Sequence, residues 1–549
     1  MENTKNSFVQ NAFILFVASI VAKFFGMFYK IPLLKILGSE GLGLYQMVYP
    51  IFAFFVVLCS NGVVVALSKS IARQNLICTK QREKQFLKAG FFVSIVTSVL
   101  LSALFCAITP YFVKRQNQPE LFLCYFAILP SILLSGINAV FRGYFFGKNK
   151  MSYAGIVQVV AQISKLVSSL FFAGMLSKNG TAMAVCGAMI GISFSEFLSS
   201  VIFAILFLKR SKTNFLAIVK QKNFAILPNK KQILMQKSFH STARSIGFGQ
   251  AVKQIFLTSF FASVEASIIP LVCAVDSILI VPLLTNAGLT NVVATSAYGL
   301  SSGIVSSIIA MPTIIANSLS SAIIPSLQSK SDQQVIQNNA SLALKIVWIC
   351  SVACMTVFLF FPKELVSLLY SGGLGDKIFD ELRISADLLR VNAPNVVYLC
   401  MLTISTSVLQ GLGKSQIPAI NLSICALIRT LFLFLLLKND STNIYGIAIA
   451  DGILYSTAFL LNMVAIKKVV NVGFGFFKTI VLPSVALLAM GIAIGFFDKV
   501  ISTFVQQKIS TILAFSLGAI TYFAFLTLTK VLDIQQVKLF LKNRREGKH

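Results

Sequence analysis

The sequence has few groups that could carry acid–base or metal chemistry. Its 549 residues include two histidines, His240 and His549, one tryptophan and 18 acidic residues. Histidine is the usual general base and metal ligand near neutral pH, and neither histidine falls in a long apolar run. The ten cysteines are scattered without metal-ligand spacing, and no P-loop or HExxH motif occurs. We therefore expect no enzyme activity, no metal and no bound cofactor.

Charge of either sign is also scarce, at 12% of the chain, whereas 56% of the residues are hydrophobic and the mean hydropathy is +0.83. A soluble protein of this length would need a far more charged surface. Many apolar runs are instead long enough to cross a hydrocarbon core of about 30 Å. We place fourteen such spans, at residues 8–29, 45–67, 89–112, 121–141, 153–176, 182–208, 259–284, 293–323, 343–361, 388–411, 416–437, 443–466, 479–497 and 510–530.

These spans predict an all-α polytopic membrane protein with two pseudo-symmetric six-helix lobes and an additional C-terminal helix pair. The first run should remain as a span, because it is long and lacks a small-residue cleavage site. The expected divisions are an N-lobe at 1–208, a basic cytoplasmic linker with an amphipathic segment at 209–258, a C-lobe at 259–467, the accessory pair at 468–530 and a basic cytoplasmic tail at 531–549.

The net charge of +29 has a membrane explanation. With the N-terminus inside, most basic residues fall in cytoplasmic connections and in the C-terminal tail, as the positive-inside rule requires. We therefore expect both termini in the cytoplasm and no nucleic-acid partner.

Two turns on the inner side show an internal repeat. One contains Arg142, Gly143 and Gly147, and the other contains Gly411 and Gly413. Each is a Gly-x-Gly-Lys-type turn that leads into a span with a cation about three turns in. Internal repeats are typical of secondary transporters, whose substrate site lies between the halves. A short cytoplasmic turn alone would also explain the glycines.

Several charged residues fall inside or at the ends of spans, where a charge costs roughly 2.5–3.5 kcal/mol on insertion scales. Such residues usually face a cavity or a partner. We predict that five cations line a substrate cavity: Lys23, Lys30, Lys165, Arg390 and Arg429. Interface anchoring is the alternative for Lys30 and Arg390, and structural pairing is the alternative for Lys165 and Arg429. The predicted ion-coupling or structural acids are Asp276, Glu196 and Asp451.

Ordered sequence blocks then resemble a known family. These are KILGSEGLGLYQMVYPIF, NGVVVALSK, FRGYFFGKNKM, AVDSILIVPLL, AYGLSSGIVSSIIAMP, IIPSL and LQGLGKSQIP. Together they resemble the stage V sporulation protein B and lipid II flippase family, in the multidrug/oligosaccharidyl-lipid/polysaccharide exporter (MOP) superfamily. The resemblance covers about residues 8–540. It implies fourteen spans, a V-shaped pair of lobes and export of an undecaprenyl-pyrophosphate-linked saccharide.

The resemblance also assigns roles to residues. It places Lys23 and Lys165 at cavity positions that arginine usually holds, and Asp276 at the family's span-seven aspartate. Lysine keeps the charge but loses the two-pronged geometry that suits a pyrophosphate. Two departures stand in span five, where Ala161 replaces a usual glutamate and Tyr153 replaces a usual proline.

The predicted function is a flippase of the bacterial plasma membrane that carries a prenyl-pyrophosphate-linked saccharide from the inner to the outer leaflet by alternating access. It would act as a monomer in the bilayer, driven by a Na⁺ or H⁺ gradient or by the membrane potential. One alternative is a multidrug cation antiporter, which would need buried carboxylates in the first lobe. Glu196 is the only acid within the predicted spans of that lobe. The others are a membrane transferase of prenyl-linked sugars and a non-transporting scaffold. The cargo could be lipid II, a spore-cortex precursor or another saccharide.

Overall fold

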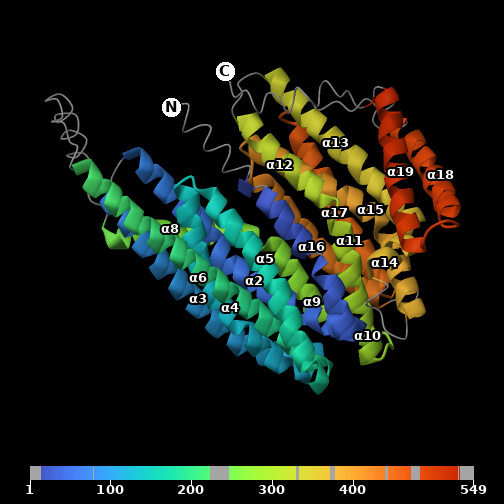
Figure 1. Ribbon diagram of the computed structural model, residues 1–549, viewed down its shortest axis with the longest axis horizontal. Helices are drawn as coiled ribbons and strands as arrows, with labels where there is room; N and C mark the ends of the chain where they lie inside the picture. Colours follow the sequence, from blue (N-terminus) through green and yellow to red (C-terminus); the bar gives the residue numbers. More distant parts are fainter. Residues whose placement is uncertain are drawn as a thin grey trace. The chain divides into compact units, whose positions relative to one another are not determined.

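The computed structural model describes most of the chain, at residues 14–15, 17–26, 28–77, 80–222, 247–328, 333–370, 378–438, 443–470, 482–529 and 531. Throughout these ranges the regular structure is helical (Figure 1). Within this described part of the chain, thirteen helical stretches are long and apolar enough to cross a membrane. One of them, Val17–Ala72, has 56 residues and would be about 84 Å long at 1.5 Å per residue, far more than one crossing needs.

That long stretch contains two spans, since its backbone breaks at Gly38, where φ is 68°. Only a glycine adopts this backbone region without strain. Counting the stretch as two gives fourteen crossings, which confirms the predicted all-α polytopic fold.

Packing divides the chain into two compact units, and each unit contains a segment from the other half of the sequence. The first unit is Met1–Tyr29 with Met47–Leu279, and the second is Lys30–Gln46 with Ile280–His549. Two helices therefore pass from one unit to the other, α2 (Lys30–Ile77) and α9 (Ile268–Asn286). The lobe limits drawn from span order stay a prediction.

The first unit is an all-helical bundle. Besides residues 14–29 and its parts of α2 and α9, it contains α3 (Lys80–Gln116), η1 (Pro119–Leu121), α4 (Phe122–Gly147), α5 (Met151–Leu176), η2 (Ser177–Asn179), α6 (Thr181–Lys222) and α8 (Phe248–Ala266). The predicted linker starts as a continuation of α6, and its middle, residues 223–246, lies outside the described residues.

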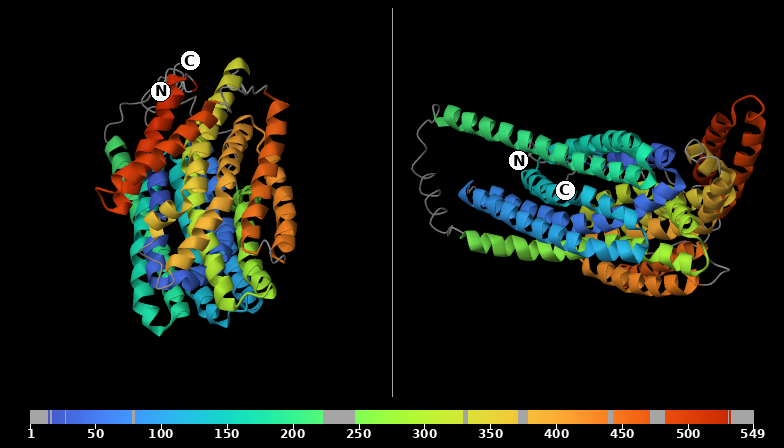
Figure 2. Two further views of the ribbon diagram at one scale, coloured as in Figure 1. Left: turned by 90° about the vertical axis from the view of Figure 1, so that its right-hand side faces the viewer. Right: turned by 90° about the horizontal axis from the view of Figure 1, so that it is seen from below.

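The second unit contains the remaining helices. They are α10 (Asn291–Tyr298), the π-helix η3 (Gly299–Val305), α11 (Ser306–Ala310), α12 (Thr313–Gln328), α13 (Gln333–Phe360), α14 (Pro362–Tyr370), α15 (Ile378–Gly411), α16 (Gln416–Leu437), α17 (Tyr445–Lys467), α18 (Leu482–Ile501) and α19 (Gln507–Leu528). Helices α18 and α19 lie side by side as the red pair in Figure 2. The hydroxyl of Tyr522 in α19 donates to the carbonyl of Ile349 in α13 at 3.0 Å, which ties this pair to the unit.

The same turn follows α4 in the first unit and α15 in the second. Three backbone hydrogen bonds, from residues 148 to 144, 149 to 146 and 150 to 145, recur from 412 to 408, 413 to 410 and 414 to 409. Asn149 and Gly413 take the left-handed backbone in the two turns, with φ of 55° and 77°. Gly147 therefore matches Gly411, and the match of Gly-x-Gly-Lys segments made from the sequence is shifted by two residues.

This register gives the two halves a common numbering, with 264 residues between equivalent positions. Lys165 lies 15 residues after Lys150, and Arg429 lies 15 residues after Lys414. The two cations predicted from the sequence thus hold the same position in α5 and in α16. The turns themselves are packing features: a Cβ on Gly147 would lie 2.6 Å from the Cβ of Ile71 in α2.

Candidate functional site

The first described helical residues, 14–15 and 17–26, run alongside α5 in the first unit. A Cβ on Gly155 would lie 3.0 Å from the Cβ of Ala18, and a Cβ on Gly26 would lie 3.5 Å from the Oε1 of Gln162. Ala18, Ala22 and Gly26 recur every four residues, so these small side chains share one helix face and let the two backbones approach closely. The contacts advance together along both helices, which therefore run parallel.

Lys165 is held by two tyrosines at the end of this contact. Its Nζ donates to the hydroxyl of Tyr49 at 3.2 Å and lies 4.4 Å from the centre of the Tyr49 ring. It also lies 5.5 Å from the centre of the ring of Tyr29, a residue that is only 3% exposed. Ring faces attract cations, so the two tyrosines hold a positive charge within a membrane-spanning part of the unit.

Lys23 differs from Lys165 in its surroundings. It follows the buried Ala22, its own side chain is exposed, and it has no hydrogen bond or ion pair with any residue that the structure describes. It lies deep within the apolar stretch that begins at Val17. An ammonium at this depth would be costly against lipid, which favours a water-filled surrounding.

A polar network joins α4 and α6 in the same unit. The side-chain nitrogen of Asn138 donates to the carboxylate of Glu196 at 2.8 Å, and the hydroxyl of Ser200 donates to the Oδ1 of Asn138 at 2.9 Å. Glu196 lies within electrostatic range of both Lys165 and Arg142. The Nε of Arg142 is shielded from solvent and has no hydrogen-bond partner among the described residues. The predicted acid is thus within electrostatic range of two cations, Lys165 on α5 and Arg142 on α4.

Lys30 belongs to the second unit and contacts the π-helix. Its Nζ donates to the carbonyl oxygen of Gly303 at 3.3 Å, and the hydroxyl of Ser307 donates to the same oxygen at 2.6 Å. The side chain of Gln46 donates to the neighbouring carbonyl of Ser302. The wider turns of a π-helix alter its hydrogen-bonding pattern, and here side chains hold its carbonyls. Lys30 therefore has a structural contact in this conformation.

Arg429 is paired rather than open to a cavity. It is 1% exposed, and its Nε and Nη2 lie 2.8 and 2.7 Å from the Oδ1 of Asp451. This is the structural pairing that the sequence left open, and it also accounts for Asp451. Arg390 is about half exposed and lies 3.8 Å from Asp387, so it occupies a helix surface. Neither arginine enters our proposed substrate site.

The other predicted positions have local explanations. Asp276 is half-buried on α9. Tyr153, one of the departures from the family pattern, stacks on Phe145 with ring centres 5.4 Å apart. Ala161 is half-buried beside Gln162, which faces Gly26.

Sequence reasoning missed the two tyrosines and Asn138, because each lies in a different span from its partner. Asparagine in an apolar run was the available signal for Asn138, since buried amides need partners.

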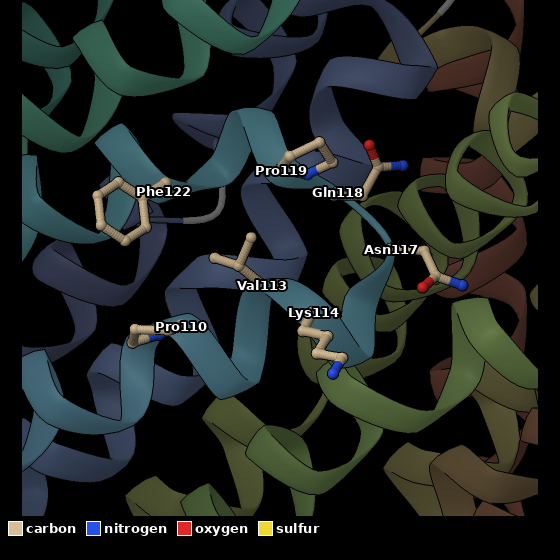
Figure 3. A pocket seen from close by; sticks show the side chains of 7 residues that line it. All are labelled: Pro110, Val113, Lys114, Asn117, Gln118, Pro119 and Phe122. Atoms are coloured by element: carbon tan, nitrogen blue, oxygen red, sulfur yellow. The ribbon is translucent and has the colours of Figure 1, made fainter.

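A surface hollow of about 710 Å³ lies at the connection between α3 and α4, apart from all these charges. Figure 3 shows its lining side chains, which come from the end of α3, the connection and the start of α4: Pro110, Val113, Lys114, Asn117, Gln118, Pro119 and Phe122. It contains none of the predicted site residues. Across the described part of the chain, no three His, Cys, Asp or Glu side chains lie close enough to hold a metal ion.

Lys23, Lys165 and Arg142 make the first unit rich in positive charge within its spans, with Glu196 held by an amide. Such an arrangement suits a negatively charged ligand. No nucleophile paired with a base was found among these residues.

Comparisons with known proteins identify relatives along most of the chain. The family model described as "Polysaccharide biosynthesis protein" matches residues 8–280, and the model described as "MatE" matches residues 271–435. The stage V sporulation protein B of Bacillus subtilis (strain 168) is 27% identical over 484 residues, 85% of each chain. The lipid II flippase MurJ of the same organism is 21% identical over an alignment of 577 positions, covering 98% of this chain and 99% of that one.

Solved structures show the same fold. Lipid II flippase MurJ in an inward closed conformation has a TM-score of 0.61 at 15% identity, covering 94% of this chain and 98% of that one. An inward-facing multidrug resistance MATE family transporter of the MOP superfamily has a TM-score of 0.58 at 16% identity, covering 83% and 98%.

Proposed function

Because the chain belongs to the MOP superfamily, as a homologue of stage V sporulation protein B and of lipid II flippase MurJ, we propose that it is a flippase for a prenyl-pyrophosphate-linked saccharide. Its cargo would be a lipid II-like precursor of cell wall or another surface polysaccharide. A headgroup of sugars and pyrophosphate cannot cross a hydrocarbon core of about 30 Å unaided, so a protein must give it a polar path.

The observation that carries the proposal is Lys23. An exposed ammonium, deep in an apolar stretch and with no partner among the described residues, is ready to receive an anion. Lys165 is the second proposed contact, on the neighbouring helix and beside Tyr29. Lysine binds phosphate as a point charge rather than with a fork, so release of the pyrophosphate would be easier than from arginine.

The proposed mechanism is alternating access. The headgroup would enter the cationic site from the inner leaflet, the prenyl tail would stay in lipid, and a rocking movement would then open the outer side. Energy would come from an ion gradient or the membrane potential. The proposed coupling acids are Glu196, which is within electrostatic range of Arg142 and Lys165, and Asp276 on α9. We propose a monomer with both termini in the cytoplasm.

A multidrug cation antiporter is the second candidate, because the MatE model matches residues 271–435. A cationic drug would need a free carboxylate, whereas the carboxylate of Glu196 is engaged by Asn138. The charge of Lys23 also opposes a cationic substrate. These two features favour the anionic cargo.

The test is flipping of fluorescent lipid II in proteoliposomes. We expect transport by the wild type, at least a tenfold loss in Lys23→Ala, and partial activity in Lys23→Arg. Lys35→Ala is the matched control, because Lys35 is also exposed and lies on the following part of the same stretch. Equal transport by Lys23→Ala and Lys35→Ala would remove Lys23 from the site.

Two further arms test the substrate class. Wild type that is inactive on lipid II but active on another undecaprenyl-pyrophosphate saccharide would change the cargo and keep the mechanism. Uptake of a cationic dye, with no movement of either lipid, would establish the antiporter instead.

A further inference from the structure

Both helices that pass between the two units carry a proline close to the crossing point. Helix α2 changes unit between Gln46 and Met47 and contains Pro50. Helix α9 changes unit between Leu279 and Ile280 and contains Pro282. In each case the proline follows the boundary by three or four residues.

This spacing has a direct backbone consequence. Proline has no N–H, so the carbonyl four residues before it loses its helical hydrogen bond. In α2 that carbonyl belongs to Gln46, the last residue before the crossing, and in α9 it belongs to Ile278, one residue before Leu279. Both helices therefore change unit where their hydrogen-bond ladder is interrupted, and a helix bends most easily at such a place.

Side chains donate to backbone carbonyls on each side of the crossing in α2. On the side of the second unit, the hydroxyl of Tyr298 donates to the freed carbonyl of Gln46 at 3.3 Å. On the side of the first unit, the carbonyl of Met47 accepts from the Nε2 of Gln116 at 3.0 Å.

Gln116 also reaches α9. Its Nε2 donates a second hydrogen bond to the carbonyl of Ser277 at 3.0 Å, and its Oε1 accepts from the hydroxyl of Tyr125 at 2.8 Å. The side chain is 0% exposed. Both amide hydrogens and the amide oxygen are used, so Tyr125 fixes the orientation of the amide. One side chain thus holds a carbonyl of each crossing helix, within three residues of each unit boundary.

We propose that Gln116 is a positioning residue that couples two proline hinges, at Gln46–Pro50 in α2 and at Ile278–Pro282 in α9. When one helix bends, the shared amide transmits the movement to the other helix, so the two helices bend together. A buried amide that lost one of these acceptors would leave a donor unsatisfied, which penalises bending of one helix alone. The link to transport rests on the proposed function, whereas the coupling of the hinges does not.

The experiment is hydrogen–deuterium exchange of the full chain in lipid nanodiscs, read in peptides that cover residues 44–52 and 274–284. Pro50→Ala restores the missing N–H in α2 and should slow exchange at least threefold in both peptides. In the double variant Pro50→Ala, Gln116→Leu, the effect should remain in 44–52 and disappear from 274–284. Gln118→Leu is the matched control for the second substitution, because Gln118 lies two residues along the same connection.

The proposal would be overturned if Pro50→Ala still slowed exchange in residues 274–284 in the Gln116→Leu background. It would also be overturned if Pro50→Ala in the wild type slowed exchange only in residues 44–52. If Gln116→Leu does not fold, Gln116→Met has a similar length and also lacks the two donors. Lipid II flipping is measured separately: we expect Gln116→Leu to lower turnover about fivefold with KM within twofold of the wild type. Coupled exchange with no flipping by any variant would contradict the flippase function and leave the coupled hinges established.

Discussion

The guanidinium of Arg429 places two nitrogens on one oxygen, the Oδ1 of Asp451, at 2.8 and 2.7 Å. Lys165 holds the equivalent position in the first half of the chain and is bound by two tyrosines instead. The repeat has therefore preserved a cation and changed its partner. In one half the charge is neutralised by an acid. In the other it is held by uncharged groups, so it can still attract an anion.

Arg429→Met should destabilise the protein by about 3 kcal/mol, because breaking a buried pair leaves the other charge without compensation. Asp451→Asn should cost a similar amount, since Arg429 is the more deeply buried partner. Thermal unfolding of purified protein measures both. The double variant should recover more than half of the loss, and two simply additive losses would show that the pair does not stabilise the fold.

Tyr49→Phe should cost about 1–2 kcal/mol of stability, because it removes the hydroxyl that accepts from Lys165 and keeps the ring. Tyr49→Leu should cost about 1 kcal/mol more, since the ring face is lost as well. A double-mutant cycle with Lys165→Met, read by thermal unfolding, isolates the contact. A coupling energy of zero would mean that the tyrosine acts by packing alone.

Gly147→Ala should destabilise by about 1–3 kcal/mol, because the new methyl group would press on the Cβ of Ile71 and on a backbone oxygen of α2. Gly174→Ala is the control: it adds the same group to α5 where no atom lies within 4 Å. For Gly174→Ala we expect a gain in stability of about 0.5–1 kcal/mol, because alanine has the higher helix propensity. Equal effects at both positions, in unfolding midpoint, would disprove close packing of α4 on α2.

The fold was largely predictable because membrane spans can be recognised from the composition and length of apolar runs. A hydrocarbon core admits only segments that satisfy their own backbone, so apolar runs must be helices. Residues such as Lys23 and Glu196 stood out for the same reason, as charges where few are tolerated. The internal repeat was also visible, although its register was wrong by two residues: the left-handed turn position is Asn149 in one half and Gly413 in the other.

What the sequence did not reveal was pairing across spans. Nothing local connects Lys165 with Tyr49, or Gln116 with Ser277, which are separated by 116 and 161 positions. Exchange of segments between the two units was equally hidden, because it depends on which helices bury each other's small residues. The relation of Pro50 to the crossing in α2 likewise depends on the packing, because the crossing is not visible in the sequence.

The π-helix Gly299–Val305 constrains the number of residues in its span. Each residue of an α-helix turns the chain by about 100°, so loss of one residue from this segment would rotate everything after it by that angle. Ser307, whose hydroxyl meets the same carbonyl as Lys30, would then point elsewhere. Substitutions here change one contact, whereas a single deletion would re-aim α11 and α12 together. Insertions and deletions, rather than side-chain replacements, are the changes that this span can least tolerate.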